Sequence, residues 1–196
     1  MSRRILKLLS AMALLVLLSG CSLPRIIVLN DPLTPRQHND LGVAYEQAGE
    51  TELALRSYRR AAKGDRCWAQ PLVNTGNVLA AGGDWKGAVT SFRAALRREA
   101  QHAEAMNNLA WSLLQQGELA EARRWAEAAL QQQPDEVLFL DTLAEIQLAQ
   151  GDAAAAGATL LRALQQPLPD AERRRLLQRL EEVTGAMGGA VGDETP

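Results

Sequence analysis

The chain alternates apolar and polar positions with helical spacing, and glycines interrupt this pattern at regular intervals. In residues 103–136, AEAMNNLAWSLLQQGELAEARRWAEAALQQQPDE, two amphipathic stretches flank Gly117 and the second ends before Pro134. Apolar residues recur every three or four positions in both stretches, which predicts two amphipathic helices. Glycine ends a helix readily because it adopts a left-handed conformation at little cost. We therefore predict a helix, a glycine turn and a second helix.

This unit recurs along the chain with a constant step of 34 residues. One glycine and two alanines keep the step through four units: Gly49, Gly83, Gly117 and Gly151; Ala54, Ala88, Ala122 and Ala156; Ala61, Ala95, Ala129 and Ala163. A fixed period of this size is the signature of a repeat array. The predicted helices are 36–48 and 51–63, 70–82 and 85–98, 103–116 and 119–132, 137–150 and 153–166, with an extra helix capped by Asp170.

The period and the residues that keep it resemble the tetratricopeptide repeat over residues 35–169. The first unit offers Leu41-Gly42, Tyr45 and Tyr58 at family positions, and the second offers Gly76 and Phe92. Three positions depart from the pattern: Thr75 replaces a usual Leu, Ala126 replaces an aromatic residue, and Gln147 stands at a Tyr position.

The resemblance implies an all-α protein, an α-solenoid of four helix–turn–helix repeats. The repeats are expected at 35–68, 69–102, 103–136 and 137–169, followed by a capping helix at 170–184 and a disordered tail at 185–196. Alanines are expected where two helix backbones approach closely. Larger side chains are expected to fill the spaces between successive hairpins: Tyr45, Tyr58, Phe92, Leu113 and Leu160.

The N-terminus carries a pattern of its own. Arg3, Arg4 and Lys7 precede a short apolar run at residues 8–18, and small residues precede Cys21, which is the pattern of a secretory signal peptide at residues 1–20. The run is shorter than the roughly 20 residues that span a bilayer, which disfavours a permanent helical anchor. Leu18-Ser19-Gly20-Cys21 also resembles the bacterial lipobox, which implies acylation of Cys21 by lipid such as palmitate; a plain signal peptide or an uncleaved helix is the alternative. With Ser22 next, the resemblance implies a lipid-anchored protein on the periplasmic face of the outer membrane.

Residues 21–34 are predicted to link this anchor to the first repeat, over about 43 Å at most if residues 22–34 are fully extended. The apolar, β-branched stretch at residues 26–29 leaves three interpretations open: packing on the first repeat, contact with the lipid surface, or addition as a strand to a partner. Thr34 and Pro35 are predicted as the N-cap and first position of the first helix.

Charge and cysteine content limit the function classes. The net charge is −2, and removal of residues 1–20 takes three cations and no acid, which gives −5. A mildly acidic protein is not expected to bind nucleic acid, and acyl chains rather than a basic patch are expected to attach it to the membrane. Cys67, the second cysteine, is predicted to be buried at the junction of the first two repeats, with an intermolecular disulfide as the alternative.

The sequence offers no catalytic or cofactor site. His38 and His102 are far apart and lack partners at metal-ligand spacing, and no nucleophile, Walker A or dinucleotide motif occurs. We predict a protein that is not an enzyme and that needs neither a metal nor another cofactor.

The resemblance implies that the first helix of each pair lines a concave groove that binds a peptide segment. Asn74 and Asn108 stand one period apart at a position where peptide-binding members often carry Asn, and an amide can pair with any peptide main chain. Trp111 is the natural aromatic anchor, with packing between helices as the equal alternative. Acidic groove positions favour a basic or neutral segment over a carboxylate clamp. The groove is predicted to include Arg36, Asn39, Asn74, Asn77, Asn107, Asn108, Trp111, Asp141 and Glu145, with Glu46, Val73, Leu138 and Thr142 on the same face.

Three functions are consistent with these features. The first is a non-catalytic, membrane-anchored scaffold that holds a partner peptide during assembly of an envelope machine such as a pilus or secretion system. The alternative is an accessory subunit of a peptide-processing or export system, a partner of a cysteine peptidase or exporter. The third is self-association through the ends of the array.

Overall fold

The structure is a computed structural model that describes residues 31–190, with side chains to Gly185. The predicted signal peptide, Cys21, residues 26–29 and the last six residues of the predicted tail lie outside the described residues. From Leu33 onward the chain forms one compact unit. Within the described residues every regular element is a helix. None of these helices has the length and apolar character needed to cross a membrane.

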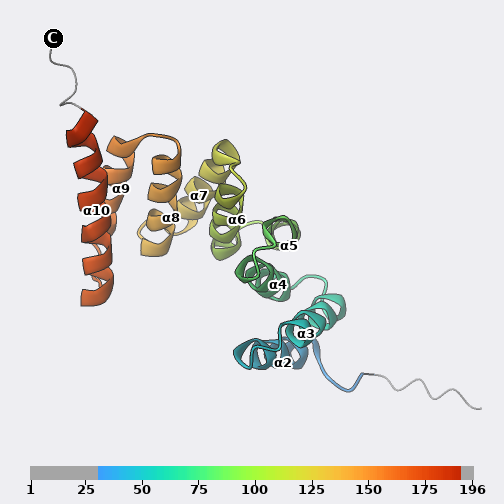
Figure 1. The fold of residues 1–196 in the computed structure, drawn as a ribbon. Helices are drawn as coiled ribbons and strands as arrows, with labels where there is room; N and C mark the ends of the chain where they lie inside the picture. The colour runs from blue at the N-terminus through green and yellow to red at the C-terminus, as the bar shows by residue number, and fades with distance from the viewer. Residues whose placement is uncertain (1–30, 191–196) are drawn as a thin grey trace, which may run out of the picture. The chain divides into compact units, whose positions relative to one another are not determined.

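The helices follow the predicted pairs closely. The bounds are α2 (Pro35–Gln47), α3 (Thr51–Gly64), α4 (Gln70–Ala81), α5 (Trp85–Arg98), α6 (Ala103–Gln115), α7 (Leu119–Gln132), α8 (Val137–Ala149), α9 (Ala153–Leu164) and α10 (Asp170–Ala190). Each helix from α2 to α9 begins and ends within two residues of its predicted bounds. Each pair packs internally, and its second helix packs against the first helix of the next pair. Figure 1 shows this series from α2 to α10.

The recurring glycines end the first helix of each pair, as predicted. Gly49, Gly83, Gly117 and Gly151 have φ values of 76°, 79°, 78° and 81°. A Cβ at any of these positions would meet no atom within 4 Å, so the backbone conformation alone requires glycine there.

The first helix begins with the predicted cap. Thr34 Oγ1 accepts a hydrogen bond from Gln37 N at 3.3 Å, and Gln37 Oε1 accepts one from Thr34 N at 2.9 Å. This reciprocal capping box satisfies two backbone donors at the start of α2, and Pro35 occupies the first turn.

The alanines that recur with the 34-residue step lie in the core, and each of them is fully buried. In the first two pairs, a glycine on the first helix contacts the aromatic ring of a residue on the second helix. Gly42 faces Tyr58, and a Cβ on Gly76 would lie 2.5 Å from Phe92 Cε1. At the positions that correspond by the 34-residue step, Ala110 accompanies Ala126, and Ala144 accompanies Leu160. Where the aromatic ring is replaced by the smaller Ala126, the glycine opposite it is replaced by the larger Ala110.

Gln147, which replaces an aromatic residue, is buried without loss of hydrogen bonding. Its Oε1 accepts a bond of 2.8 Å from Thr159 Oγ1 of the following helix. A buried amide is tolerated when such a partner is present.

The last helix covers the outer side of the last pair. α10 packs on α9, and its Leu176 and Val183 are buried with Leu180 beside them. It continues to Ala190, six residues beyond the predicted end at 184, where the sequence predicted a disordered tail. Extension of a formed helix needs no new nucleus, so even a glycine-rich continuation is helical here.

Two predicted placements are wrong. Cys67 is exposed rather than buried, because Asp65 Oδ1 accepts the backbone N–H groups of Cys67 and Trp68 at 2.9 and 3.2 Å. These bonds hold the turn between α3 and α4 without the thiol. Val73, expected on the groove face, is fully buried in the core.

Candidate functional site

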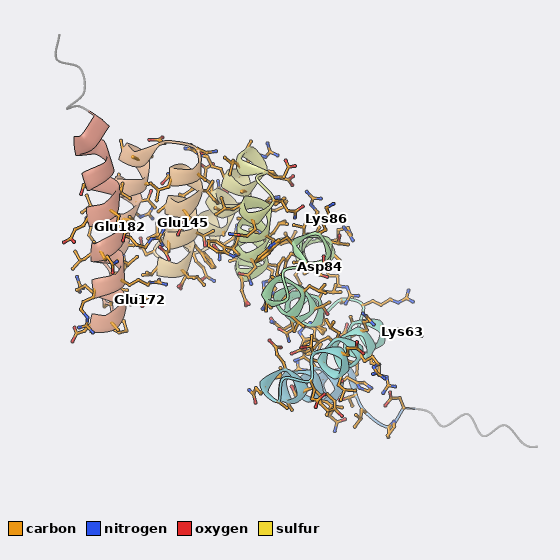
Figure 2. All side chains as sticks on the ribbon, viewed as in Figure 1. Lys63, Asp84, Lys86, Glu145, Glu172 and Glu182 are labelled. Atoms are coloured by element: carbon orange, nitrogen blue, oxygen red, sulfur yellow. The ribbon has the colours of Figure 1, made fainter. Side chains whose placement is uncertain are left out.

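A pocket of ≈ 370 Å³ lies where α6, α8 and α10 meet. Figure 2 labels Glu145 on α8, with Glu172 and Glu182 on α10. The structure brings five of the predicted groove residues into the pocket, adds two predicted neighbours, and contributes two residues that the sequence did not indicate. Its lining is Asn107, Asn108 and Trp111 from α6, Leu138, Asp141, Thr142 and Glu145 from α8, and Arg175 and Arg179 from α10.

The apolar part of the pocket consists of Trp111 and Leu138. Their side chains are 37% and 52% exposed, although both are large and hydrophobic. Buried neighbours on the same helices, such as Leu109 and Leu140, supply the packing between helices. Most of the Trp111 surface is therefore packed against the protein, and its exposed part borders the pocket.

The charged part is an ion-pair network between α8 and α10. Asp141 accepts from Arg175 Nη2 at 3.1 Å and from Arg179 Nη1, and Arg179 Nη2 lies 2.6 Å from Glu145 Oε1. Asp141 is only 8% exposed, so its charge is stabilised by these guanidinium groups rather than by water.

The two arginines change the expected electrostatics. Asp141 and Glu145 were expected as acidic groove positions. In the structure they are balanced by Arg175 and Arg179, so this part of the groove is close to neutral. These two acids therefore give no preference for a basic partner segment.

The predicted asparagines bond to one another across helices. Asn74 Nδ2 donates to Asn39 Oδ1, and Gln70 Nε2 donates to Asn74 Oδ1, both at 2.9 Å. Asn108 Nδ2 donates to Asn77 Oδ1 at 2.9 Å. These bonds join α2 to α4 and α4 to α6, so the amides help to fix the spacing between helices as well as offering polar groups to a ligand.

Asn107 differs from the other amides. It is almost fully buried, its Nδ2 lies 3.5 Å from Asn108 Oδ1, and its Oδ1 accepts no hydrogen bond from the described residues. A buried acceptor without a partner costs free energy. Because this oxygen has almost no accessible surface, Asn108, which is only part-buried, is the amide that a ligand in the pocket can reach.

The remaining predicted groove residues lie away from the pocket. The guanidinium of Arg36 lies 5.9 Å from the centre of the Trp68 ring, in a cation–π contact. Glu46 accepts from Tyr58 Oη at 2.7 Å; burial, and then this hydrogen bond, raise the pKa of Tyr58. Asn39, Asn74 and Asn77 lie on α2 and α4 and do not line the pocket.

The histidines lie apart, on different elements. His102 Nδ1 accepts from Ala105 N at 3.3 Å and caps α6, whereas His38 is buried in α2. Over residues 31–190, no three His, Cys, Asp or Glu side chains come together in a way that could hold a metal ion.

Family models of the tetratricopeptide repeat match residues 38–66, 73–137 and 138–162. The chain contains tetratricopeptide repeats. No curated protein matches the sequence.

Solved structures of other tetratricopeptide-repeat proteins share the fold. MamA from Desulfovibrio magneticus RS-1 is 21% identical with a TM-score of 0.69, covering 79% of this chain and 85% of MamA. PilF from Pseudomonas aeruginosa is 22% identical with a TM-score of 0.67, covering 82% and 73%. The first repeat domain of Spaghetti (RPAP3), bound to the HSP90 peptide SRMEEVD, is 16% identical with a TM-score of 0.59, covering 63% and 98%. At these identities the likeness concerns the fold alone.

Proposed function

We propose that this chain is a non-catalytic scaffold that holds an extended segment of a partner protein in the pocket between α6, α8 and α10. The observation that carries the proposal is Trp111, a large aromatic side chain left 37% exposed in a pocket beside Leu138 and the amide of Asn108. Aromatic anchors dominate many protein interfaces, and an amide can pair with the main chain of any peptide.

The segment that fits best is extended and has an apolar side chain. Such a side chain would lie against Trp111 and Leu138, while a main-chain N–H would donate to Asn108 Oδ1. The paired charges of Asp141 and Glu145 give no preference for a strongly basic segment. The peptide bound to the Spaghetti domain gives a precedent for peptide recognition on this fold.

The wider setting follows from the N-terminus. We propose that each pair from α2 to α9 is one repeat, which gives four, and that an acyl group on Cys21 tethers them to the periplasmic face of the outer membrane. A short tether suits a scaffold that collects partners during assembly of an envelope machine such as a pilus or secretion system.

Trp111→Ala is expected to weaken binding of the partner segment by roughly 30-fold, the equivalent of about 2 kcal/mol, because the anchor surface is lost. The ligand is selected by display of tiled segments of envelope proteins from the same genome. Its affinity is then measured by isothermal titration calorimetry.

Leu161→Ala is the matched control, since Leu161 is as exposed as Leu138 but lies on α9 outside the pocket. Its affinity should equal that of the wild type. If both variants bind equally well, the segment binds elsewhere.

Cys21→Ser is expected to abolish incorporation of labelled palmitate and to release the protein from the membrane fraction. The serine hydroxyl cannot replace the thiol that would carry the lipid. Mass spectrometry of the N-terminal peptide and fractionation of cell envelopes test this, with Cys67→Ser as the control. Membrane retention and an unchanged mass in the Cys21 variant would refute the lipid anchor.

A further inference from the structure

The net charge of the chain conceals a strongly basic segment. Residues 51–99 contain nine arginines and lysines against four acids, a net charge of +5 in a chain whose total is −2. Most of these cations lie on α3 and α5, the second helices of the first two pairs. The corresponding helices α7 and α9 carry two cations and one, and α7 has two acids as well.

Four of these cations surround a hollow of ≈ 540 Å³ formed by α3, the turn after it, α4 and α5. We call this the basic hollow, defined by Arg59, Lys63, Arg66 and Arg98 with Ala62, Leu72 and Thr75 between them. It is separate from the pocket of α6, α8 and α10. Figure 2 labels Lys63, which is on α3.

Arg98 builds the rim of the basic hollow. Its guanidinium donates to the carbonyl oxygens of Ala62, Asp65 and Trp68 at 2.9, 3.0 and 2.8 Å. These bonds hold the turn that carries Arg66. Two acids nearby are engaged with the same turn, since Asp65 accepts from Cys67 N, and Glu99 Oε1 accepts from Ala69 N at 2.7 Å.

Arg59, Lys63 and Arg66 are exposed, and within the described part of the chain none of them forms an ion pair. By contrast, Arg93, one repeat period after Arg59, pairs with Glu121 at 2.8 Å. These three positive charges repel each other around one hollow. Binding of an external anion there would therefore lower the electrostatic energy.

We propose that the basic hollow and the adjoining face of α3 dock on the surface of an anionic phospholipid bilayer. Guanidinium and ammonium groups match the phosphates of lipid headgroups, and the fixed turn presents Arg66 beside Arg59 and Lys63. The proposal uses the membrane tether proposed above, because α2 and α3 are the first helices after the N-terminal segment. A tether of at most about 43 Å is long enough for this pair to reach the bilayer surface.

The composition of the hollow favours lipid over nucleic acid. No aromatic residue lines it, whereas single-stranded nucleic acids are held by stacking on aromatic side chains. A bilayer requires only cations spread over an accessible face. The cations of the docked face lie on α3, on the turn after it and on α5, which leaves the pocket beside Trp111 open to a partner.

The test uses residues 21–196 with Cys21→Ser, so that no acyl chain contributes. All described core residues are kept, since the compact unit begins at Leu33. We expect binding to vesicles of phosphatidylcholine and phosphatidylglycerol, and none to phosphatidylcholine alone, by co-sedimentation at physiological salt. Each of Arg59→Gln, Lys63→Gln and Arg66→Gln should lower the partition coefficient about fivefold, and the triple variant roughly 100-fold.

The double variant Arg124→Gln/Arg174→Gln is the matched control for Arg59→Gln/Lys63→Gln, since both change the net charge equally and both control residues are exposed. The control should bind vesicles within about twofold of the wild type, whereas its counterpart should lose roughly 30-fold. Circular dichroism checks that all variants remain folded.

Absence of vesicle binding, or equal losses in the two double variants, would overturn the proposal. Binding to a duplex oligonucleotide or an acidic peptide with no binding to vesicles would also overturn it, in favour of another anionic partner. None of these outcomes involves the peptide segment or the Trp111 pocket, so this proposal and the scaffold function can fail separately.

Discussion

Asp141→Ala is expected to lower the free energy of unfolding by about 3 kcal/mol, a large effect for one polar residue. Asp141 is nearly buried and accepts from both Arg175 and Arg179, which join α10 to α8. Its removal leaves Arg179, whose side chain is only 18% exposed, with Glu145 as its remaining ion-pair partner among the described residues. Urea denaturation followed by circular dichroism gives the measurement.

Arg175→Ala provides the comparison. Its side chain is 54% exposed, and an ion pair in that position contributes about 1 kcal/mol or less. If Asp141→Ala costs no more than Arg175→Ala, the network does not hold α10 on the array.

Gly76→Ala is expected to destabilise the fold by about 2–3 kcal/mol, although alanine normally stabilises a helix interior relative to glycine. The added methyl group would lie 2.5 Å from the Phe92 ring, and both residues are buried. Phe92→Ala alone should cost about 3–5 kcal/mol through the cavity it leaves. Because the methyl group then has room, the double variant should cost less than the sum by at least about 2 kcal/mol. Ala110 with Ala126 shows that the chain itself uses the smaller combination at another repeat position.

Gly157→Ala is the control for the glycine, because it lies within α9 and its Cβ would meet nothing closer than 3.9 Å. It should stabilise the protein by about 0.5–1 kcal/mol. The same thermal or urea unfolding experiment serves all variants. If the loss of stability in the Gly76→Ala/Phe92→Ala double variant equals the sum of the two single losses, the ring and the glycine are not in contact.

Sequence reasoning predicted the helices well because the packing repeats. A glycine at Gly49 that recurs at Gly83, Gly117 and Gly151 reports the same backbone requirement four times, and each φ value agrees. The recurring alanines likewise indicate a close approach of two helices at the same place in every pair. Any single position would have been ambiguous.

The candidate site was predicted less completely because its ion pairs involve α10, which lies beyond the four predicted repeats. Arg175 stands 34 residues after Asp141, one repeat step, but the groove was predicted from the first helices of the four pairs only. The hydrogen bonds between asparagine side chains do not follow the 34-residue step. Asn39 and Asn74 are 35 residues apart, and Asn77 and Asn108 are 31 residues apart. Amphipathic spacing showed which face these residues occupy, but not their partners.

The total charge of −2 does not show how the charges are distributed, since α3 and α5 carry most of the cations of a segment with a net charge of +5. The i,i+4 spacing of Arg59 and Lys63 already places them on one face of α3, and the structure adds Arg66 and Arg98 to the same hollow.

Site-specific photocrosslinking in intact cells tests the central claim most directly. A benzoylphenylalanine at position 111 or 138 should form a crosslink to one defined segment of one partner protein, identified by mass spectrometry. The same probe at position 161, which is as exposed as position 138 but lies outside the pocket, should not crosslink to that segment. Equal crosslinking from all three positions, or none from 111 and 138, would contradict a scaffold that holds its partner between α6, α8 and α10.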